Sequence, residues 1–520
     1  MVVVNGRSDG VILVWRRFSV AVERPKTPSA GAVAGGRCCW RREEGRPGDW
    51  CWDWCCYFWP EMESDGSCNG RATGCGAATG QRNERQRGWK KKKEEEEKKQ
   101  LFVFLVLPCL LRSWGSTTSM AISTLSRVMD TFSLILILGL LSYNIDSSKA
   151  DDFNVLNSGA AGDGIRDDSQ AFQKAWIAAC AATTNNPTVV VPAGMKFLVK
   201  PVGFNGPCKS PTITFQVNGE IMAPDSPGAW ARLDQSQWLA FKGVQGLRFS
   251  GPGSINGRGQ GWWNQNCRDD PSLAVKFLSC KDLSITNLHF VDSPQSHMLL
   301  MECNSVYVNN LNVKAPGLSP NTDGIHIQSV TDLTISNSII STGDDCVSIG
   351  DYTSNINITH IMCGPGHGIS IGSLGKDGNV VRVENIHVSD VNFTRTTNGA
   401  RIKTWQVGKG NVRGVSFQNI KLNSVENPII IDQNYCDRST CIEQPTGVRI
   451  SDVTFRGITG TSSTSVAINL KCSHAVACTG IVLDNIQLTS NITGQSITSN
   501  CVNAYGASVG VVRPVDCIKH

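Results

Sequence analysis

The stretch LSITNLHF (283–290) sets the pattern of the second part of the chain. Apolar residues alternate with others over its first four positions, an asparagine stands fifth, and the sixth and eighth positions are apolar again. The phrase recurs seven times, with starts offset by 23, 27, 23, 30, 29, 33 and 33 residues. Such spacing is typical of a repeat architecture. The other copies are VYVNNLNV (306–313), LTISNSII (333–340), INITHIMC (356–363), IHVSDVNF (386–393), VSFQNIKL (415–422), VRISDVTF (448–455) and IVLDNIQL (481–488).

The alternation within each copy predicts a half-buried strand. The repeat is too short for a propeller blade of roughly 40–50 residues, and a β-sandwich would show hairpin turns without a fixed Asn/Asp column. We therefore predict an all-β chain that coils into a parallel β-helix. The column should lie at one bend of successive coils, because Asx side chains satisfy backbone donors there. Its members are Asn287, Asn310, Asn337, Asp390, Asn419, Asp452 and Asn485.

The ends of such a coil need covers, because they expose apolar side chains and unpaired strand edges. Asp167-Asp168-Ser169 precedes AFQKAWIAAC (171–180), which predicts a short, N-capped helix with its apolar face on the first coil. VVVPAG (189–194) is expected to begin the first strands. The close cysteine pairs are disulfide candidates, and they are Cys346 with Cys363, Cys436 with Cys441, Cys472 with Cys478, and Cys501 with Cys517.

Residues 1–119 show no lasting period, so we interpret them as an unpatterned extension, disordered or outside the mature protein. A cysteine-based metal or interaction module remains the alternative there, although no paired CxxC spacing supports it. Residues 120–150 resemble a secretory signal peptide, with Arg127, an apolar core at 132–141 and Ala150 at the end. Residues 151–520 form the predicted β-helix domain, which we expect to be secreted, extracellular and located in the cell wall.

Charge and cysteine content separate the two parts of the chain. Residues 1–150 hold 22 Lys and Arg against 16 Asp and Glu, whereas residues 151–520 hold 27 against 28, a net charge of −1. The overall charge of +5 therefore gives no support to nucleic-acid binding by the repeat domain. Thirteen cysteines after residue 150 indicate an oxidising compartment, which agrees with secretion.

Charged residues collect in four stretches of consecutive coils: SPNTDGIHI (319–327), STGDDCVSIG (341–350), GPGHGISIG (364–372) and NGARIKTW (398–405). Asp323 and Asp344 are 21 residues apart, and Asp344 and His367 are 23 apart, which is close to one coil. These three side chains should therefore stack on neighbouring rungs, about 4.8 Å apart. One face would present Asp323, Asp344, Asp345, His367, Arg401 and Lys403.

Three crowded carboxylates repel one another, which raises the pKa of at least one of them and suits a proton donor. Calcium is the main competing interpretation, because clustered acids also bind hard cations. The neighbouring Arg401 and Lys403 argue against an ion site, so we expect neither a metal nor a cofactor. The surrounding glycines are expected to let a ligand approach the backbone closely.

The motifs NTDG, GDD, GHG and RIK, in this order, resemble the four hallmark stretches of the polygalacturonases of plant type, glycoside hydrolase family 28. The resemblance runs from about Phe153 to about Cys517. It implies a right-handed parallel β-helix of the pectin lyase-like kind. It also implies hydrolysis of α-1,4 galacturonosyl bonds in polygalacturonate, the de-esterified form of pectin, by an inverting acid/base mechanism.

The resemblance also implies catalytic roles for the clustered residues. Asp344 corresponds to the general acid that protonates the leaving oxygen. Asp323 and Asp345 correspond to the pair that holds and deprotonates the attacking water, and His367 supports the acid and positions the substrate. A separation of roughly 6.5–9.5 Å between acid and base would leave room for that water.

Substrate contacts are implied in the same way. Arg401 and Lys403 resemble the cations that bind a galacturonate carboxylate, and Asn321 and Tyr435 correspond to further groove contacts. The expected partner is polygalacturonate, with no nucleic acid and no membrane after signal cleavage, and the protein is expected to be a monomer. A lyase or rhamnogalacturonan-cleaving relative, and a non-catalytic wall-binding β-helix, remain alternatives. Endo and exo action are not distinguished.

Overall fold

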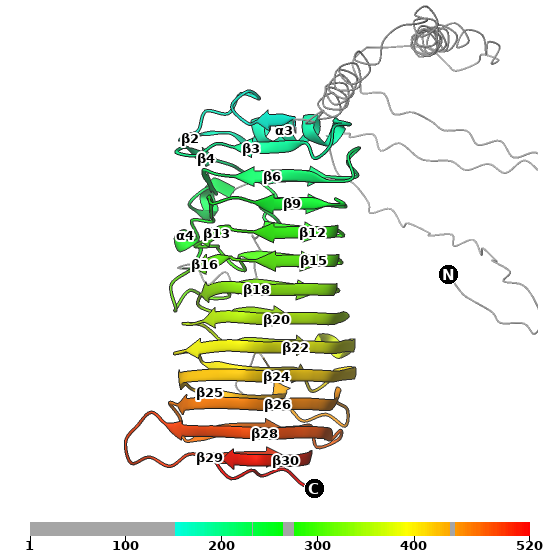
Figure 1. Cartoon of the computed structure of the whole chain (residues 1–520), viewed down its shortest axis with the longest axis vertical. Coiled ribbons are helices and arrows are strands. Elements are labelled where there is room, and N and C mark those ends of the chain that lie inside the picture. Colours follow the sequence, from blue (N-terminus) through cyan, green and yellow to red (C-terminus); the bar gives the residue numbers. More distant parts are fainter. Residues whose placement is uncertain (1–150, 231, 264–274, 437–441) are drawn as a thin grey trace, which may run out of the picture. The chain divides into compact units, whose positions relative to one another are not determined.

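The computed structural model describes residues 151–520 apart from 231, 264–274 and 437–441. Within these residues the strands stack coil upon coil into two sheets, and the recorded pairings between strands are parallel (Figure 1). The predicted all-β parallel β-helix is thereby confirmed. The expected extension 1–119 and signal peptide 120–150 lie outside the described residues. Among those described, no helix is both long and apolar enough to cross a membrane.

One sheet has 11 strands, and the charged motifs lie on its strands or just before them. Its strands are β5 Val202–Asn205, β8 Leu239–Lys242, β11 Val275–Leu278, β14 Met298–Met301, β17 Ile325–Gln328, β19 Val347–Ile349, β21 Ile369–Leu374, β23 Asn398–Trp405, β25 Asn427–Tyr435, β27 Val466–Lys471 and β29 Thr498–Val502.

The other sheet has 19 strands, and two short strands of each early coil merge into one long bent strand from β18 onward. The short strands are β1 Asp152–Asn154, β2 Asp163–Asp167, β3 Thr188–Val191, β4 Lys196–Leu198, β6 Ile213–Val217, β7 Glu220–Met222, β9 Leu247–Ser250, β10 Ser254–Asn256, β12 Lys281–Thr286, β13 His289–Val291, β15 Asn304–Asn309 and β16 Asn312–Lys314. The others are β18 Thr331–Ser341, β20 Thr353–Cys363, β22 Val380–Thr394, β24 Lys409–Val425, β26 Arg449–Ser462, β28 Cys478–Ser490 and β30 Ala504–Arg513.

The apolar positions of the repeated phrase form the core between the sheets. Ile285, Val308 and Ile335 are register partners in successive coils, and each is fully buried. Aromatic rings continue the stacking in the early coils, where Phe241 and Phe277 lie parallel with centroids 5.2 Å apart. Stacking like residues in this way fixes the register of each coil, because a shift by one residue would turn the apolar set outward.

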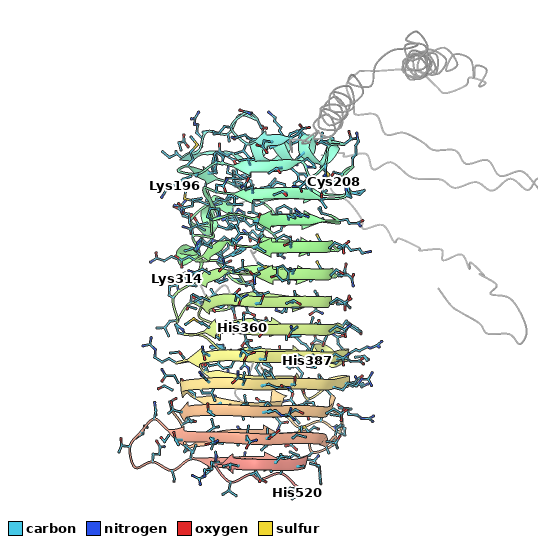
Figure 2. The ribbon with its side chains drawn as sticks, viewed as in Figure 1. Lys196, Cys208, Lys314, His360, His387 and His520 are labelled. Carbon is cyan, nitrogen blue, oxygen red and sulfur yellow. A yellow bond between two sulfur atoms is a disulfide. The ribbon has the colours of Figure 1, made fainter. Side chains whose placement is uncertain are left out.

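Eight successive coils of the 19-stranded sheet bend twice, five residues apart, at residues with left-handed backbone geometry. The first bend lies at Asp282, Ser305, Asp332, Asn355, Asn385, Gly414, Asp452 and Gly480. The second lies at Asn287, Asn310, Asn337, His360, Asp390, Asn419, Gly457 and Asn485, and His360 is labelled in Figure 2. Asx side chains hydrogen-bond along each column, as Asn355 does to Asp332 at 2.9 Å and Asn310 to Asn287 at 2.8 Å.

The prediction that Asp452 belongs to the second bend was wrong. Val453 is the register partner of Val415, so Gly457 takes the position that Asn419 holds one coil earlier. Asp452 lies at the first bend instead. The phrase at 448–455 matched the repeat because alternating apolar residues precede both bends and an Asx residue can occupy either bend.

The predicted capping helix is α3, Ser169–Ala181, and it buries Phe172, Ala175 and Trp176 as expected. Its N-cap, Asp168, makes no side-chain capping bond, because its carboxylate accepts the backbone N–H groups of Ala161 and Gly162. The expectation that strands begin at 189–194 was also wrong. Strands β1 and β2 precede the helix and pair with β3 and β4. Short helical segments elsewhere are η1 Pro227–Trp230, α4 Gln260–Trp263 and η2 Lys376–Gly378.

Three predicted disulfides are confirmed, namely Cys346–Cys363, Cys472–Cys478 and Cys501–Cys517. Cys436 is disulfide-bonded, but its expected partner Cys441 lies outside the described residues. The bond between Cys180 at the end of α3 and Cys208 was not predicted, because the two cysteines are 28 residues apart. It ties the capping helix to the coil that it covers.

Candidate active site

The charged motifs meet along one edge of the 11-stranded sheet, where the chain enters β17, β19 and β21. Ile325, Val347 and Ile369 are register partners, and two residues before them lie Asp323, Asp345 and His367. The prediction that Asp344 stacks between Asp323 and His367 is therefore corrected by one residue. Asp345 takes the stacked position, and Asp344 precedes it in the loop.

Asp345 is the buried centre of the cluster, with a side chain only 2% exposed. Its Oδ1 accepts hydrogen bonds from Arg401 at 2.6 Å and from the Ser370 hydroxyl at 2.7 Å, and its Oδ2 lies 3.0 Å from Lys403 Nζ. Burial alone would raise the pKa of Asp345. The Arg401 and Lys403 charges outweigh that effect and lower it to about 2, so the group is a carboxylate at any ordinary pH.

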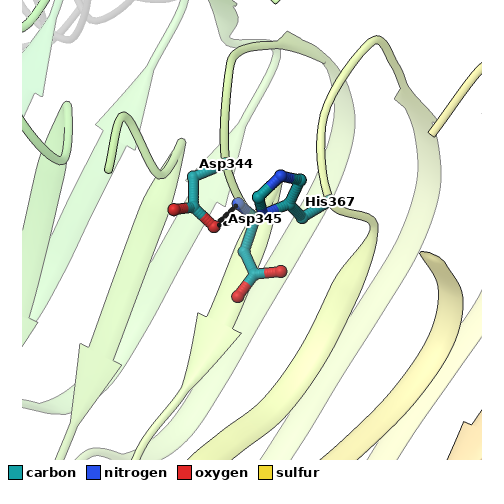
Figure 3. A group of neighbouring side chains, drawn as sticks. All are labelled: Asp344, Asp345 and His367. Atoms are coloured by element: carbon teal, nitrogen blue, oxygen red, sulfur yellow. Dashed lines mark hydrogen bonds and ion pairs between the residues drawn. The ribbon is translucent and has the colours of Figure 1, made fainter. Parts of the chain in front are cut away.

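Asp344 and His367 form a second pair beside it. Asp344 Oδ1 lies 2.8 Å from His367 Nδ1 and accepts the backbone N–H of Asp345 at 2.8 Å (Figure 3). The two side chains are 20% and 39% exposed, so this pair reaches solvent whereas Asp345 does not. The hydrogen bond to Asp344 raises the pKa of His367, although partial burial opposes the rise.

Asp323 lies one coil before Asp345, and no lysine or arginine among the described residues is bonded to it. Its Oδ2 accepts the Ser348 hydroxyl at 2.6 Å, and its backbone oxygen accepts His297 N–H at 2.8 Å. Burial, followed by the charges of Asp344 and Asp345, raises the pKa of Asp323 well above its ordinary value. Crowding of the carboxylates was predicted to raise one carboxyl pKa; the pKa of Asp323 is raised, but burial contributes more to the rise than the neighbouring carboxylates do.

The residues expected to bind substrate lie beside the cluster. The Arg401 and Lys403 side chains are 12% and 10% exposed and are bonded to Asp345, so any uronate carboxylate would share them with that anion. Lys403 Nζ lies 5.2 Å from the centroid of the Tyr435 ring, which packs edge-on against Trp405. Asn321 has left-handed backbone geometry two residues before Asp323.

Close stacking of the coils holds these loops in place. A Cβ on Gly343 would lie 1.9 Å from the Ser319 oxygen, and one on Gly368 would lie 2.1 Å from the Asn398 oxygen. Contacts between coils therefore require glycine at these two positions. The Cys346–Cys363 disulfide fixes the residue after Asp345 to the end of β20.

Three polar residues that the sequence analysis did not single out complete the site. His326, Ser348 and Ser370 are register partners with Arg401, and they form one column on the outer face of the sheet. Each follows a residue of the neighbouring column by three positions, as His326 follows Asp323 and Ser348 follows Asp345. That constant spacing was the available signal.

A metal could in principle be held by Asp344, Asp345 and His367, whose candidate ligand atoms lie within 4.8 Å of one another. However, both oxygens of Asp345 already accept bonds from Arg401 and Lys403, and these cations would repel a further positive charge. The donor set therefore fits a carboxylate and cation cluster better than it fits an ion site. The arrangement combines one permanently ionised carboxylate with one that retains its proton more readily, as acid/base chemistry requires.

The sequence profile of glycosyl hydrolases family 28 matches residues 180–509. A probable polygalacturonase of Arabidopsis thaliana is 45% identical over 371 residues, which are 70% of this chain and 80% of that protein. The chain belongs to family 28 of the glycosyl hydrolases. A polygalacturonase of Malus domestica is 43% identical over 378 residues, 71% of this chain and 80% of the relative. Membership in family 28 makes the protein a glycoside hydrolase, as the motifs predicted.

Solved structures support the fold of this family 28 enzyme. An endo-xylogalacturonan hydrolase from Aspergillus tubingensis superimposes with a TM-score of 0.59 at 24% identity, covering 68% of this chain and 98% of the other. A polygalacturonase from Erwinia carotovora superimposes with a TM-score of 0.54 at 24% identity, covering 67% and 94%. Both likenesses agree with the stacked parallel strands described above.

Proposed function

We propose that this protein is a secreted, monomeric hydrolase that cleaves α-1,4 galacturonosyl bonds of polygalacturonate with inversion at the anomeric carbon. The observation that carries the proposal is a cluster of three carboxylates from two consecutive coils, Asp323, Asp344 and Asp345. The cations of Arg401 and Lys403 lie beside this cluster. Relatives at 45% and 43% identity bear the name polygalacturonase, which supports the choice of substrate. A polyanionic substrate also suits a site with cations at its centre.

The proposed roles divide the three carboxylates by environment. Asp344 is the general acid, because it is the most accessible of the site's described carboxylates and bonds His367 at 2.8 Å. Asp345 stays ionised, orients the attacking water and stabilises positive charge that develops at the anomeric carbon. Asp323, whose pKa is raised, is the stronger base and accepts the water's proton.

Reducing-end release from polygalacturonate tests the reaction. We expect release that persists in a calcium chelator, with no ultraviolet-absorbing product, and proton NMR should show the β-anomer first. An unsaturated product that requires calcium would indicate a lyase, and binding without products would indicate a wall-binding protein. Product sizing on the same digest distinguishes endo from exo action.

The assignment of acid and base is tested separately. Asp344→Asn should lose about 10²–10⁴-fold in turnover on polygalacturonate but much less on an aryl α-galacturonide, whose leaving group needs no proton. The activity of Asp323→Asn should not recover on the aryl substrate. It should recover when azide is added, because azide is a nucleophile that needs no base to deprotonate it. The opposite pattern would exchange the two roles.

Secretion and the monomeric state need their own measurements. N-terminal sequencing of protein collected from culture medium should begin near residue 151, as the apolar core at 132–141 and the dense cysteines suggest. Retention in the cell with residues 1–119 attached would contradict secretion. Gel filtration with light scattering should give the mass of one chain.

A further inference from the structure

A chain of two hydrogen bonds connects Asp323 with an imidazole that no step of the proposed reaction uses. Asp323 Oδ2 accepts the Ser348 hydroxyl at 2.6 Å, and Ser348 Oγ lies 2.7 Å from His326 Nδ1. Ser348 and His326 are register partners on β19 and β17. The direct separation between His326 Nδ1 and Asp323 Oδ2 is 3.9 Å, so the hydroxyl mediates the contact.

The number of protons available to these two hydrogen bonds determines which atom donates in each. The Ser348 hydroxyl has one proton, and if it goes to an ionised Asp323, then His326 must donate Nδ1–H to the serine oxygen. If Asp323 instead carries its proton on Oδ2, Asp323 donates to Ser348, Ser348 donates to His326, and the imidazole must hold its proton on Nε2. The charge on Asp323 is thereby linked to the tautomer of His326.

We propose that His326 is a positioning residue that acts on Asp323 through Ser348: its Nδ1–H holds the serine as a donor and so keeps the Asp323 carboxylate oriented and ionised as a base. The catalytic part of this inference rests on the proposed function. The link between tautomer and carboxylate charge does not depend on it.

The surroundings of His326 suit this role. Asp345 before β19 favours a proton on the ring, while Lys403 on β23 and Lys276 on β11 disfavour one. Burial is the largest effect, and it lowers the pKa of His326 to about 4, so the ring is neutral at ordinary pH and must choose a tautomer. The His326 side chain is still 36% exposed, so Nε2 can exchange its proton with solvent.

The neighbouring coil contains the same arrangement with a different end. Ser370 donates to Asp345 and accepts Arg401 Nε at 2.7 Å. A guanidinium can only donate hydrogen bonds, so Arg401 always donates to Ser370, Ser370 always donates to Asp345, and Asp345 stays ionised. The His326 imidazole can either donate or accept at Nδ1. Of the two hydrogen-bond arrangements, only the one that ends at Asp323 can therefore reverse its donors and acceptors.

The wild-type protein allows a direct test by ¹⁵N NMR of histidine-labelled material, with the His326 signals identified by their loss in His326→Asn. We expect an Nδ1–H tautomer at high pH that converts to Nε2–H as pH falls and Asp323, followed by carboxyl ¹³C NMR, takes up its proton. An Nε2–H tautomer throughout, or a tautomer that does not change while Asp323 is protonated, would overturn the proposal. The readout does not require turnover, so an enzyme inactive on polygalacturonate would contradict the proposed function alone.

Kinetics of three variants test the effect on Asp323. Loss of the donor in Ser348→Ala should raise the pKa of Asp323 and move the acid limb of kcat upward by about one pH unit, with KM within about twofold. His326→Leu should shift the limb in the same direction, and His326→Asn, which keeps an N–H donor, should restore part of the shift. If the Ser348→Ala protein melts like wild type and its acid limb of kcat is unshifted, the positioning role of His326 is refuted. If Ser348→Ala does not fold, the comparison of His326→Leu with His326→Asn decides the question.

Discussion

Ser348 and Ser370 are register partners on β19 and β21, and each donates its hydroxyl to the aspartate that lies one coil before it. The two aspartates nevertheless have opposite electrostatic surroundings. Asp345 also bonds Arg401 and Lys403, which lower its pKa to about 2. Asp323 bonds no lysine or arginine within the part of the chain that the structure describes, and its pKa is raised. Repetition of the coil thus provides two similar carboxylate sites, and the cations that follow on β23 make them chemically different.

Removing the charge of Asp345 should destabilise the fold as well as abolish activity. Asp345→Asn leaves Arg401 and Lys403 buried without their anion, and breaking such a cluster costs about 3–5 kcal/mol. Urea unfolding monitored by fluorescence measures the difference from wild type. Asp344→Asn is the matched control, because Asp344 is 20% exposed and bonds no lysine or arginine in the described structure, so its stability should change by less than about 1 kcal/mol. Equal stability of the two variants would contradict the buried cluster.

Arg401→Lys should be more than a conservative change. Arg401 donates from Nε to Ser370 and from a terminal nitrogen to Asp345, and one ammonium group on a shorter, unforked side chain cannot reproduce both bonds. We expect KM for polygalacturonate to rise about tenfold or more, because the cation also meets the substrate carboxylate in the proposed complex. Initial rates on oligogalacturonates provide the measurement, and Arg413→Lys is a control at a surface pair remote from the motifs. Unchanged KM in Arg401→Lys would remove Arg401 from substrate binding.

The repeat predicted most of the fold because a β-helix depends on one local pattern used many times. Alternating residues determine which side chains enter the core, and this is visible in each copy. The sequence did not separate the two bends that lie five residues apart, so Asp452 was assigned to the wrong one. Only the pairing of Val453 with Val415 settles that register.

The sequence predicted which charged residues lie close together, but it did not predict how they are bonded. The motifs indicated that Asp345, Arg401 and Lys403 are close, whereas their mutual ion pairs depend on side-chain directions across two coils. Ser348, Ser370 and His326 were missed because serine and histidine in a strand are common on any solvent-facing surface. Their function depends on which aspartate each one faces.

Stability should depend on pH through His367, which bonds Asp344. The pKa of His367 is raised above 6.5 in the folded protein. The stability that the His367–Asp344 pair contributes is therefore fully present below pH 6.5 and is lost as pH rises through the pKa of the folded state. His367→Asn should therefore be less stable than wild type at pH 6, and the gap should narrow by pH 9. The effect should be small, because the His367 side chain is 39% exposed and solvent screens the pair. Urea unfolding at both pH values measures the gap, and a gap that widens with pH would contradict the pairing.

The Cys346–Cys363 disulfide should matter for catalysis beyond its effect on stability. It closes a loop with a sequence separation of 17, for which the loss of the bond costs about 3 kcal/mol. Cys346 follows Asp345 directly, so opening the bond also releases the loop that positions Asp344 and Asp345. Cys346→Ala/Cys363→Ala should therefore lose about tenfold or more in kcat at a temperature where the protein is still folded, because small misplacements of catalytic groups are costly.

Cys501→Ala/Cys517→Ala is the control, because it opens a disulfide of similar sequence separation, 16, at the far end of the coil stack. We expect a comparable fall in melting temperature with kcat close to wild type. Thermal melts followed by circular dichroism, together with initial rates on polygalacturonate, separate the two effects. If both variants lose kcat in proportion to their loss of stability, the Cys346–Cys363 bond stabilises the fold only and does not position the aspartates.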